Sequence, residues 1–521
     1  MADEHRHEAQ GPVGAMQPED TMQRLPSTKP CLLHWLRSRI CLPVTVLVLF
    51  QVGLIAQVQS SAAAHRQVEQ LVNESAANWK QVSKQIWDYA ELGYHENKSS
   101  ALLQSQLEAA GFRVQSGVAD EPTAFIASYG QGKPVIAILG EFDALPGLSQ
   151  QALPERAPVV AGAPGHACGH NLLGSGAALA AVAVKQYMET NRIPGTLRYY
   201  GTPAEEGGSG KAYMVRDGLF KDVDVILHWH PADENSVTNG GMLADISAKF
   251  TFHGIAAHAA MAPERGRSAL DAVMLMGDGI EFMREHVPSN TRIHYVITKG
   301  GAAPNIVPDL AQMHLMARNP SNATLKGIWD RILKVAQGAA LMTGTTYEVT
   351  DIGGDANIIG NDVLAQVAQK NLEEVGGYTL DASQREFALK LQKTLGFENP
   401  PSLDQTRSVQ PLEPVDPNAP AASTDVGDVS WMVPTIGFEA ATFVPGVAPH
   451  TWQAAASTGM SIGQDGMVVA SKALAITAVD LFQKPQLVQA VKADFQGKLA
   501  GKTYFTAIPA DQKPLINYRN D

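Results

Sequence analysis

This chain has 521 residues, of which 45% are hydrophobic and 18% are charged, and its formal net charge is −12. Its length and apolar content predict two globular domains with extensions. The acidic balance argues against nucleic acid as a partner, because phosphate recognition needs clustered Lys and Arg. Of the cysteines, Cys31 and Cys41 lie near the N-terminus and only Cys168 lies in the globular part. A disulfide framework within the globular part is therefore excluded.

The N-terminal 64 residues differ in character from the rest of the chain. Residues 1–30 are polar and rich in Pro, which is typical of disorder. An apolar run over residues 40–56 follows two arginines and precedes an A-x-A pattern that ends at Ala64, and these are the parts of a secretory signal. We predict a cleaved leader and export to a periplasm. A membrane anchor formed by residues 40–56 is the alternative, and a misassigned start or a buried segment is a third possibility.

Helices and strands alternate after the leader. The apolar patterns predict helices over residues 73–92, 99–110 and 171–188, and strands over residues 134–140, 196–201 and 223–227. The character changes near residue 246, where the pattern predicts a strand at 246–252, a helix at 268–286, strands at 291–298 and 311–318, and a helix at 325–342. That order is typical of a small α+β domain inserted in a larger one.

We therefore predict an α/β protein with an inserted domain. The main domain spans residues 65–245 and 355–490 and has a mostly parallel central sheet flanked by helices. The inserted α+β domain spans residues 246–354. A stretch over residues 397–422, rich in Pro and Asp, predicts a surface loop, and residues 491–521 form a C-terminal extension.

Acidic, Cys and His residues follow four apolar segments of the main domain. The carboxyl ends of neighbouring strands meet at one edge of a parallel sheet, so these side chains should converge in one pocket. Carboxylates, imidazoles and a thiol together indicate a transition-metal site and not a nucleotide site. The converging residues are Glu141, Asp143, His166, Cys168, His170, Glu205, Glu206, His228 and His230.

Each of these residues also has an interpretation without metal. Cys168 could be a small buried hydrophobic residue, but its Gly and His neighbours favour a ligand. His166 is better explained as support for its loop. The adjacent Glu205 and Glu206 could be a solvated charge run, yet they follow a strand and lie among glycines. Adjacent carboxylates suit two roles, in which one binds metal and the other accepts a proton from water.

Three further residues are weaker candidates when taken alone. Glu141 and Asp143 are either caps of a helix or turn, or carboxylates that orient a ligating imidazole. His450 lies far from the other candidates in sequence. It gains weight because a site for two metal ions still lacks one ligand.

Six stretches together resemble the amidohydrolase branch of the dinuclear aminoacylase/carboxypeptidase metallopeptidases, family 20 of the metallopeptidases. The resemblance extends over residues 67–482 and excludes the leader. Glu141 departs from the His that the aminoacylase branch has at this position, and the Cys168/His170 pair compensates. The six stretches are residues 140–146, 165–174, 203–211, 253–260, 300–308 and 422–431.

The resemblance implies a catalytic domain that holds two divalent ions and an inserted lid domain that also mediates dimerisation. It implies Glu205 as the general base and Asp143 as a second carboxylate that supports the site. His228 and His230 compete for one ligand position, and the spacing from Glu206 in the family favours His230. The implied metal ligands are Cys168, His170, Glu206, His230 and His450. The implied substrate contacts are His258, Asn305 and Arg318, with His258 reaching into the site of a partner subunit and stabilising the reaction there.

The implied activity is hydrolysis of the amide bond of N-acyl amino acids by metal-activated water, with p-aminobenzoyl-glutamate as the expected substrate. The implied metal is Mn or Zn, with Co possible, and the implied assembly is a homodimer or a heterodimer with a related subunit. We expect no nucleic acid partner, and membrane contact only through an uncleaved N-terminal segment. A dipeptidase or an auxin-type conjugate hydrolase is an alternative. A non-catalytic carboxylate-binding homologue is another, but Glu205 and all five expected ligands are intact.

Overall fold

The computed structural model describes residues 41–416, 418–419 and 421–519, with side chains from residue 61 onward. The chain divides into two compact units, Met1–Ser60 and Ser61–Asp521, and the fold below is that of the second unit. The leader and the apolar run at residues 40–56 fall outside the residues whose side chains are described, so both stay predictions. Among the helices of the described part, none has the length and apolar character that a membrane crossing requires.

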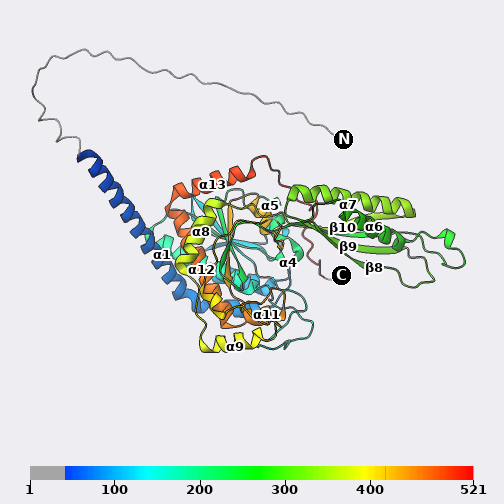
Figure 1. The fold of residues 1–521 in the computed structure, drawn as a ribbon, viewed down its shortest axis with the longest axis horizontal. Coiled ribbons are helices and arrows are strands. Elements are labelled where there is room, and N and C mark those ends of the chain that lie inside the picture. Colours follow the sequence, from blue (N-terminus) through cyan, green and yellow to red (C-terminus); the bar gives the residue numbers. More distant parts are fainter. Residues whose placement is uncertain (1–40, 417, 420, 520–521) are drawn as a thin grey trace, which may run out of the picture. The chain divides into compact units, whose positions relative to one another are not determined.

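A seven-stranded sheet forms the centre of the larger part of this unit (Figure 1). Its order is β1-β2-β4-β3-β5-β11-β6. The four central strands, β4, β3, β5 and β11, are parallel, while β1, β2 and β6 pair antiparallel at the edges. The prediction of a mostly parallel central sheet is therefore confirmed. The strands are β1 (Arg113–Ser116), β2 (Phe125–Gln131), β3 (Val135–Gly140), β4 (Gly195–Gly201), β5 (Val225–Ala232), β6 (Ser236–Thr238) and β11 (Thr435–Ala441).

Helices pack on both faces of this sheet and enclose its core. The helices of this part are α1 (Cys41–Tyr89), α2 (Asn97–Ala109), α3 (His170–Asn191), α4 (Glu205–Gly208), α5 (Gly210–Arg216), α8 (Asp362–Val375), α9 (Ala382–Gln392), α10 (Val426–Ser430), α11 (Trp452–Thr458), α12 (Ser461–Gln483) and α13 (Pro485–Leu499). Short 3-10 turns lie at η1 (Val118–Asp120) and η3 (Leu403–Arg407).

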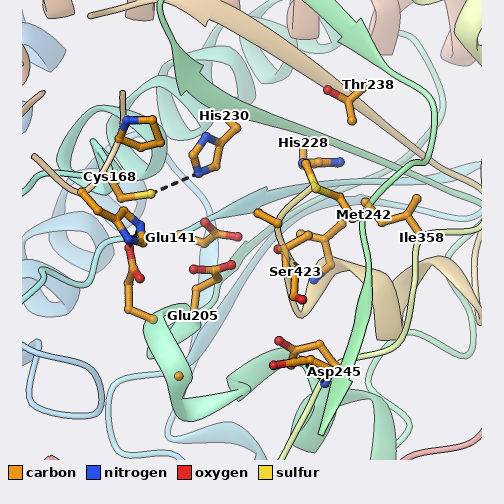
Figure 2. Close-up of a pocket in the computed structure, with 18 of the residues that line it drawn as sticks. Glu141, Cys168, Glu205, His228, His230, Thr238, Met242, Asp245, Ile358 and Ser423 are labelled. Atoms are coloured by element: carbon orange, nitrogen blue, oxygen red, sulfur yellow. Dashed lines mark hydrogen bonds and ion pairs between the residues drawn. The ribbon is translucent and has the colours of Figure 1, made fainter. Parts of the chain in front are cut away.

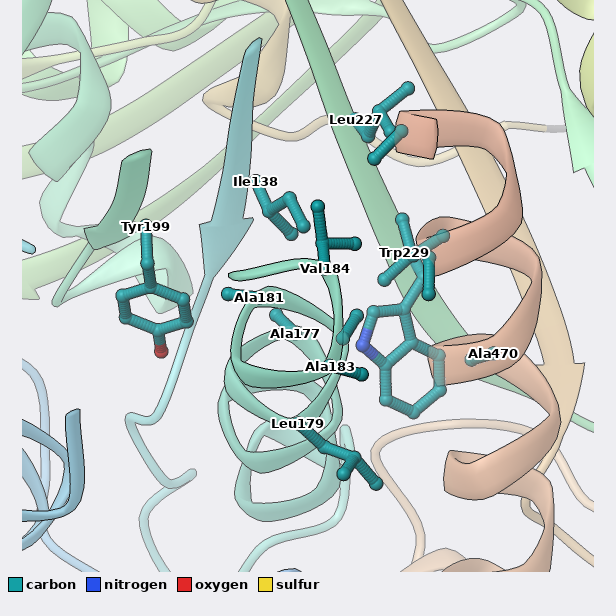
Figure 3. Close-up of a cluster of buried hydrophobic side chains, with 14 of the residues drawn as sticks. Ile138, Ala177, Leu179, Ala181, Ala183, Val184, Tyr199, Leu227, Trp229 and Ala470 are labelled. Atoms are coloured by element: carbon teal, nitrogen blue, oxygen red, sulfur yellow. The ribbon is translucent and has the colours of Figure 1, made fainter. Parts of the chain in front are cut away.

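Helix α3 lies at the buried centre of this core (Figure 3), and its first residue, His170, lies at the polar edge of the sheet. Small residues let α12 and the Trp229 indole approach it closely. A Cβ at Gly176 would lie 2.8 Å from Met467 Cγ and 3.0 Å from Trp229 Cζ2. The indole also donates to the Leu173 carbonyl at 3.0 Å. This packing fixes the start of α3, where His170 is the first helical residue.

A second, four-stranded antiparallel sheet has its own core. Its order is β10-β7-β9-β8, and helices α6 and α7 pack against it. The sequence pattern found all of these elements except β10. The roles of this region as a lid and a dimerisation domain stay predictions. The elements are β7 (Ala244–His253), η2 (Pro263–Arg265), α6 (Ala269–Arg284), β8 (Arg292–Lys299), β9 (Leu310–Asn319), α7 (Asn322–Thr343) and β10 (Thr346–Gly353).

Three segments differ from the sequence-based expectation. Strand β5 continues to Ala232, so His228 and His230 lie within the strand and not after it. The stretch at residues 397–422 contains the turn η3, whose Leu403 and Thr406 are buried. Helix α13 extends the fold past residue 490, because Val491 and Phe495 are buried in the core. These parts are more closely integrated into the fold than their composition suggested.

Candidate metal centre

A cavity of ≈ 470 Å³ opens at the carboxyl ends of the parallel strands and is bounded on its far side by strands β7 and β9. Figure 2 shows Cys168, His230, Glu141 and Glu205 gathered on one side of it. Met242, Ile358, Ser423 and Asp245 lie on the other side (Figure 2). One wall is thus rich in metal-ligand chemistry, and the other mixes apolar and polar groups.

Two triads of ligand atoms share the Cys168 thiol. The ligand atoms of Cys168, His170 and His230 lie within 4.8 Å of one another, and so do those of Cys168, Glu206 and His450. The Cys168 sulfur is 3.4 Å from His230 Nε2. The Glu206 carboxylate is 3.3 Å from His450 Nε2. The structure therefore brings together all five residues expected as ligands, in two groups with one shared atom.

Several buried atoms at this place have no hydrogen-bond partner, which fits a pair of cations. Among the described residues, the unpartnered buried atoms include His170 Nε2, Glu206 Oε1 and Glu141 Oε2. Leaving a buried polar atom unpaired costs about 1–3 kcal/mol. A divalent ion would satisfy them, and the combination of sulfur, nitrogen and oxygen donors suits a first-row transition metal.

Asp143 supports both triads without belonging to either. Its Oδ1 lies 2.9 Å from His170 Nδ1, and its Oδ2 accepts from the Glu206 amide at 2.9 Å. Burial acts to raise the pKa of Asp143, but His170 and the Glu206 amide outweigh it and hold that pKa below its usual range. An ionised carboxylate in this position orients the imidazole and the loop that carries Glu206.

Glu205 belongs to neither of the triads that share Cys168, but its carboxylate forms a third group of possible ligand atoms with Glu141 and His170. Its Oε2 is 4.0 Å from His170 Nε2. Burial, the Glu141 carboxylate and the Glu206 carboxylate raise the pKa of Glu205 well above its usual range. Its side chain is 12% exposed and lines the cavity, so a molecule in the cavity can reach it.

Glu141 belongs to a buried ion-pair chain that the sequence did not reveal. Its Oε1 lies 2.6 Å from Lys211 Nζ, and its Oε2 lies 3.3 Å from His170 Nε2. Lys211 Nζ also lies 2.6 Å from Asp425, and both side chains are fully buried. Burial acts to lower the pKa of Lys211, but the Asp425 and Glu141 carboxylates raise it. Lys211 therefore stays charged. No spacing pattern marked Lys211 or Asp425, although both lie in the stretches that carried the family resemblance.

His228 and His230 have distinct environments. His230 faces Cys168 and belongs to the first triad. His228 lies closer to Met242 on the other side of the cavity (Figure 2). Burial lowers the pKa of His228 to about 4, and its ring fills the space beside Gly437, where a Cβ would lie 2.6 Å from Nε2. The geometry favours His230 as the ligand and leaves His228 as a neutral group of the cavity wall.

Of the expected substrate contacts, only Arg318 lines the cavity. It pairs in register with Asp245 across strands β9 and β7. Its Nε and Nη2 lie 3.2 and 3.1 Å from the Met316 sulfur. A thioether is a weak acceptor, so the guanidinium keeps donor capacity for an anion. Asp245 and Asp355, which the sequence did not indicate, line the same wall.

The other two expected contacts lie away from this cavity. His258 and Asn305 are exposed in the region of the small sheet, and neither lines the cavity of its own chain. His258 Nδ1 accepts from the Ala260 and Met261 amides at 3.2 and 3.1 Å. Within one chain these residues are not brought to the site, so their role stays a prediction that requires a second subunit. His166 bonds the Ile86 carbonyl at 3.0 Å and supports its loop, as expected.

Comparison with known proteins identifies relatives of this architecture. The family model described as peptidase family M20/M25/M40 matches residues 137–391. One of the subunits of p-aminobenzoyl-glutamate hydrolase from Escherichia coli (strain K12) is 41% identical over 474 residues, covering 86% of this chain and 98% of that protein. The Xaa-Arg dipeptidase of Mus musculus is 30% identical over 455 residues, covering 83% of this chain and 92% of that protein. A dinuclear metal-binding peptidase of the M20 family from Bacillus subtilis has a similar fold, with a TM-score of 0.53 and 17% identity over 79% of this chain and 99% of that chain.

Proposed function

Because this chain belongs to the peptidase family M20/M25/M40 and is a metal-dependent amidohydrolase, we propose that it cleaves the amide bond of N-acyl amino acids, with p-aminobenzoyl-glutamate as the preferred substrate. The observation that carries this proposal is 41% identity over 98% of the p-aminobenzoyl-glutamate hydrolase subunit from Escherichia coli. A cavity of ≈ 470 Å³ suits a substrate of that size.

Five side chains would hold a pair of divalent ions. The shared Cys168 would serve both ions, because its sulfur belongs to both triads. Bound there, the ions would supply Lewis-acid activation of water and of the substrate carbonyl. Zn²⁺ and Mn²⁺ both suit this donor set, and Co²⁺ is possible. The ligands would be Cys168, His170, Glu206, His230 and His450.

Glu205 would act as the general base. Its carboxylate lines the cavity 4.0 Å from His170 Nε2, where it can accept a proton from water and later donate that proton to the leaving amine. Asp143 would keep His170 in its orientation through the contact at 2.9 Å. Lys211 would hold Glu141 in place on the other side of the same imidazole.

Arg318 would bind the α-carboxylate of the released amino acid. A guanidinium offers two parallel N–H donors to a carboxylate, and in this structure the described acceptor is only the Met316 thioether. The apolar residues Met242, Ile358 and Phe438 would contact the acyl group, because they line the same cavity.

A dipeptidase with a preference for a basic residue is the second candidate. Asp245 and Asp355 line the cavity beside Arg318, and Asp355 Oδ1 is buried without a hydrogen-bond partner. A cationic side chain could pair with these carboxylates. The relative named Xaa-Arg dipeptidase is consistent with this alternative.

We also propose that the enzyme works as a homodimer or with a related subunit, and that it is exported. The edge strand β8 and helix α6 expose Val296, Ile297, Met274 and Phe282, which supports contact with a second chain. The Escherichia coli relative is one of two similar proteins named as subunits of the same hydrolase, which supports a further subunit here. The apolar run and the A-x-A pattern at the N-terminus support export.

The test compares three substrates on metal-loaded protein whose bound metal has been quantified: p-aminobenzoyl-glutamate, its α-amide, and a dipeptide that ends in Arg. We expect kcat/KM for the acid to exceed that for the α-amide by roughly 10²-fold or more, because the α-amide cannot form the charge-assisted hydrogen bonds that a carboxylate makes with the partly buried Arg318 guanidinium. Arg318→Ala should reduce the difference in kcat/KM between the two substrates, chiefly by slowing cleavage of the acid. Arg292→Ala is the matched control, since Arg292 is exposed and pairs with Arg318 in the sheet register.

Each alternative predicts a different result. Equal kcat/KM for the acid and the α-amide would rule out carboxylate recognition by Arg318. Faster cleavage of the Arg dipeptide would favour the second candidate. Stoichiometric metal without cleavage of any N-acyl amino acid would indicate a binding protein.

A further inference from the structure

The last 20 described residues, 500–519, follow helix α13 and form no helix or strand. In Figure 1 this segment continues from α13 in red. Its first part is fixed to both sheet regions. The Tyr504 hydroxyl donates at 2.5 Å to Asp428, which lies in α10. The Phe505 carbonyl accepts from Asn322, the first residue of α7, at 2.7 Å.

Its middle part is fixed in the same way. Gln512 Nε2 donates to the Tyr213 hydroxyl at 2.9 Å and to the Ile352 carbonyl at 2.7 Å. Tyr213 lies in α5 and Ile352 in β10, so one amide joins the two regions. The Gln512 carbonyl accepts from Arg216, and Ile508 is buried. The segment is therefore an integral part of the fold.

The end of the segment reaches the candidate metal centre. The Tyr518 hydroxyl donates to the Glu206 carbonyl at 2.9 Å, and Arg519 Nη2 donates to the same oxygen. The Tyr518 ring meets the Tyr94 ring edge to face, with centroids 6.0 Å apart. Tyr94 in turn donates to the Gly208 carbonyl at 2.8 Å. Two aromatic residues from opposite ends of the chain thus enclose the loop that carries Glu206.

This loop cannot hold its conformation by local structure alone. Helix α4 has four residues, and Glu206 within it departs from helical geometry at φ −71° and ψ 61°. Ala204 and Ser209 on either side have φ of 56° and 53°, a region that residues with a Cβ rarely adopt. Such a backbone persists only where surrounding contacts determine it.

The contacts to Glu206 come from two directions. Its amide donates to Asp143 at 2.9 Å, and its carbonyl accepts from the C-terminal segment. Its side chain then lies 3.3 Å from His450 Nε2. Close packing supports this arrangement: a Cβ at Gly93 would lie 2.6 Å from the Tyr518 hydroxyl and 2.8 Å from Ala204 Cα. Position 93 therefore has no room for a residue larger than glycine.

We propose that Tyr518 and Arg519 are positioning residues that aim the Glu206 carboxylate at the metal shared with His450. The C-terminal segment would thereby determine the affinity of the Glu206/His450 site for its ion and leave the His170/His230 site unaffected. This inference rests on the proposed function, because it assumes that Glu206 is a metal ligand.

The test uses the full chain with the double substitution Tyr518→Phe and Arg519→Ala, which removes both donors and keeps the aromatic ring. We expect the Kd of one of two ions to rise by about 10- to 100-fold, because outer partners of metal ligands have effects of that size. The kcat should fall by a similar factor. Amide hydrogen exchange of residues 204–210, followed by mass spectrometry, should accelerate. Replacing Arg519 by Lys instead of Ala should restore part of the affinity for that ion.

Tyr504→Phe is the matched control, because it removes a hydroxyl from the same segment at a place remote from Glu206. It should leave both ions bound with native Kd, even if it lowers the melting temperature. The inference is overturned if the double variant exchanges residues 204–210 at the native rate, or if it binds both ions with native Kd. Failure of the proposed function would show differently, as native protein that holds two ions without cleaving N-acyl amino acids.

Discussion

The adjacent carboxylates Glu205 and Glu206 have different surroundings, and exchanging each for an amide should separate their roles. Glu206 Oε1 lies 3.3 Å from His450 Nε2, whereas Glu205 Oε2 lies 4.0 Å from His170 Nε2. Glu205→Gln should lower kcat by about 10²- to 10⁴-fold and leave bound metal unchanged, since it removes only a base. Glu206→Gln should lower bound metal. Metal analysis and steady-state kinetics on both variants would show this, and exchanged phenotypes would reverse the assignment.

The Cys168 thiol should be protected when metal is bound. It lines the cavity, so an alkylating reagent can reach it. A thiolate that binds metal cannot attack the reagent, whereas the chelated protein presents an unligated thiol, which reacts slowly because burial raises the pKa of Cys168. We expect labelling of the Cys168 peptide to accelerate after chelation, as measured by peptide mass spectrometry that excludes Cys31 and Cys41. Equal labelling rates with and without chelator would remove Cys168 from the site.

Individual site residues could be predicted to the extent that their chemistry is local in sequence. Cys168 and His170 are two residues apart, and the pair Glu205-Glu206 follows a strand, so their convergence followed from the sheet. Lys211 and Asp425 could not be predicted, because their 2.6 Å contact joins residues 214 positions apart. Neither residue type is distinctive alone, and only the folded core makes a buried ion pair of them.

At the scale of elements, helices and strands with a strong hydrophobic pattern could be predicted from the sequence, and those with a weak pattern could not. Helix α3 was predicted because its small and apolar residues pack on all sides. Strand β10 was not predicted, because none of its residues is fully buried and its alternation is limited to its first four residues. Pairing with β7 determines it, which is a tertiary effect on strand formation. Helix α13 had no counterpart among the predicted elements, which described residues 491–521 only as a C-terminal extension.

His65 connects three helices and should make stability depend on pH. Its Nδ1 lies 3.0 Å from Glu374 in α8, and its Nε2 lies 3.0 Å from Asp480 in α12. Burial acts to lower the pKa of His65, but the Asp480 and Glu374 carboxylates raise it above 6.5. A raised pKa means that the stabilisation is complete below pH 6.5 and is lost as pH rises through the folded value.

The measurement compares unfolding free energy at several pH values in the native chain and in His65→Gln. At pH 6 the substitution should cost about 1.5–3 kcal/mol, the size of a hydrogen bond to a charged group. The difference should shrink toward alkaline pH. His95→Gln is the control, because His95 is exposed and contacts neither carboxylate. A cost that stays constant from pH 6 to alkaline pH would show that His65 does not titrate between the two acids.

At the scale of the whole molecule, the cavity depends on segments far apart in sequence. Its metal side comes from the loops after β3 and β4, from β5 and from His450, two residues before α11, whereas Arg318 and Asp245 come from the small sheet. The C-terminal segment adds contacts to Glu206 from the opposite end of the chain. Sequence spacing could indicate which residues converge along parallel strands, but not which face of the inserted sheet meets them.

His258 provides the test of whether one chain makes a complete site. It is exposed and does not line the cavity of its own chain, so a catalytic role requires that a second subunit present it. His258→Ala and Glu205→Gln should each be nearly inactive alone. A hybrid dimer of the two variants contains one site with an intact Glu205 and a His258 from its neighbour. Random assortment makes about half of the dimers hybrids with one working site in two, so activity should return to about a quarter of the native value.

The experiment co-expresses the two variants with different affinity tags and isolates the doubly tagged species. Purified hybrids should then have about half of the native kcat per dimer, because one of two sites is complete. The control hybrid carries Arg265→Ala in place of His258→Ala. Arg265 is exposed in the neighbouring turn η2, so the Arg265→Ala variant should already be active by itself. Purified hybrids with no activity would show that His258 does not act across the interface. The exposed side chains of β8 and α6 would then need another partner, such as the related subunit.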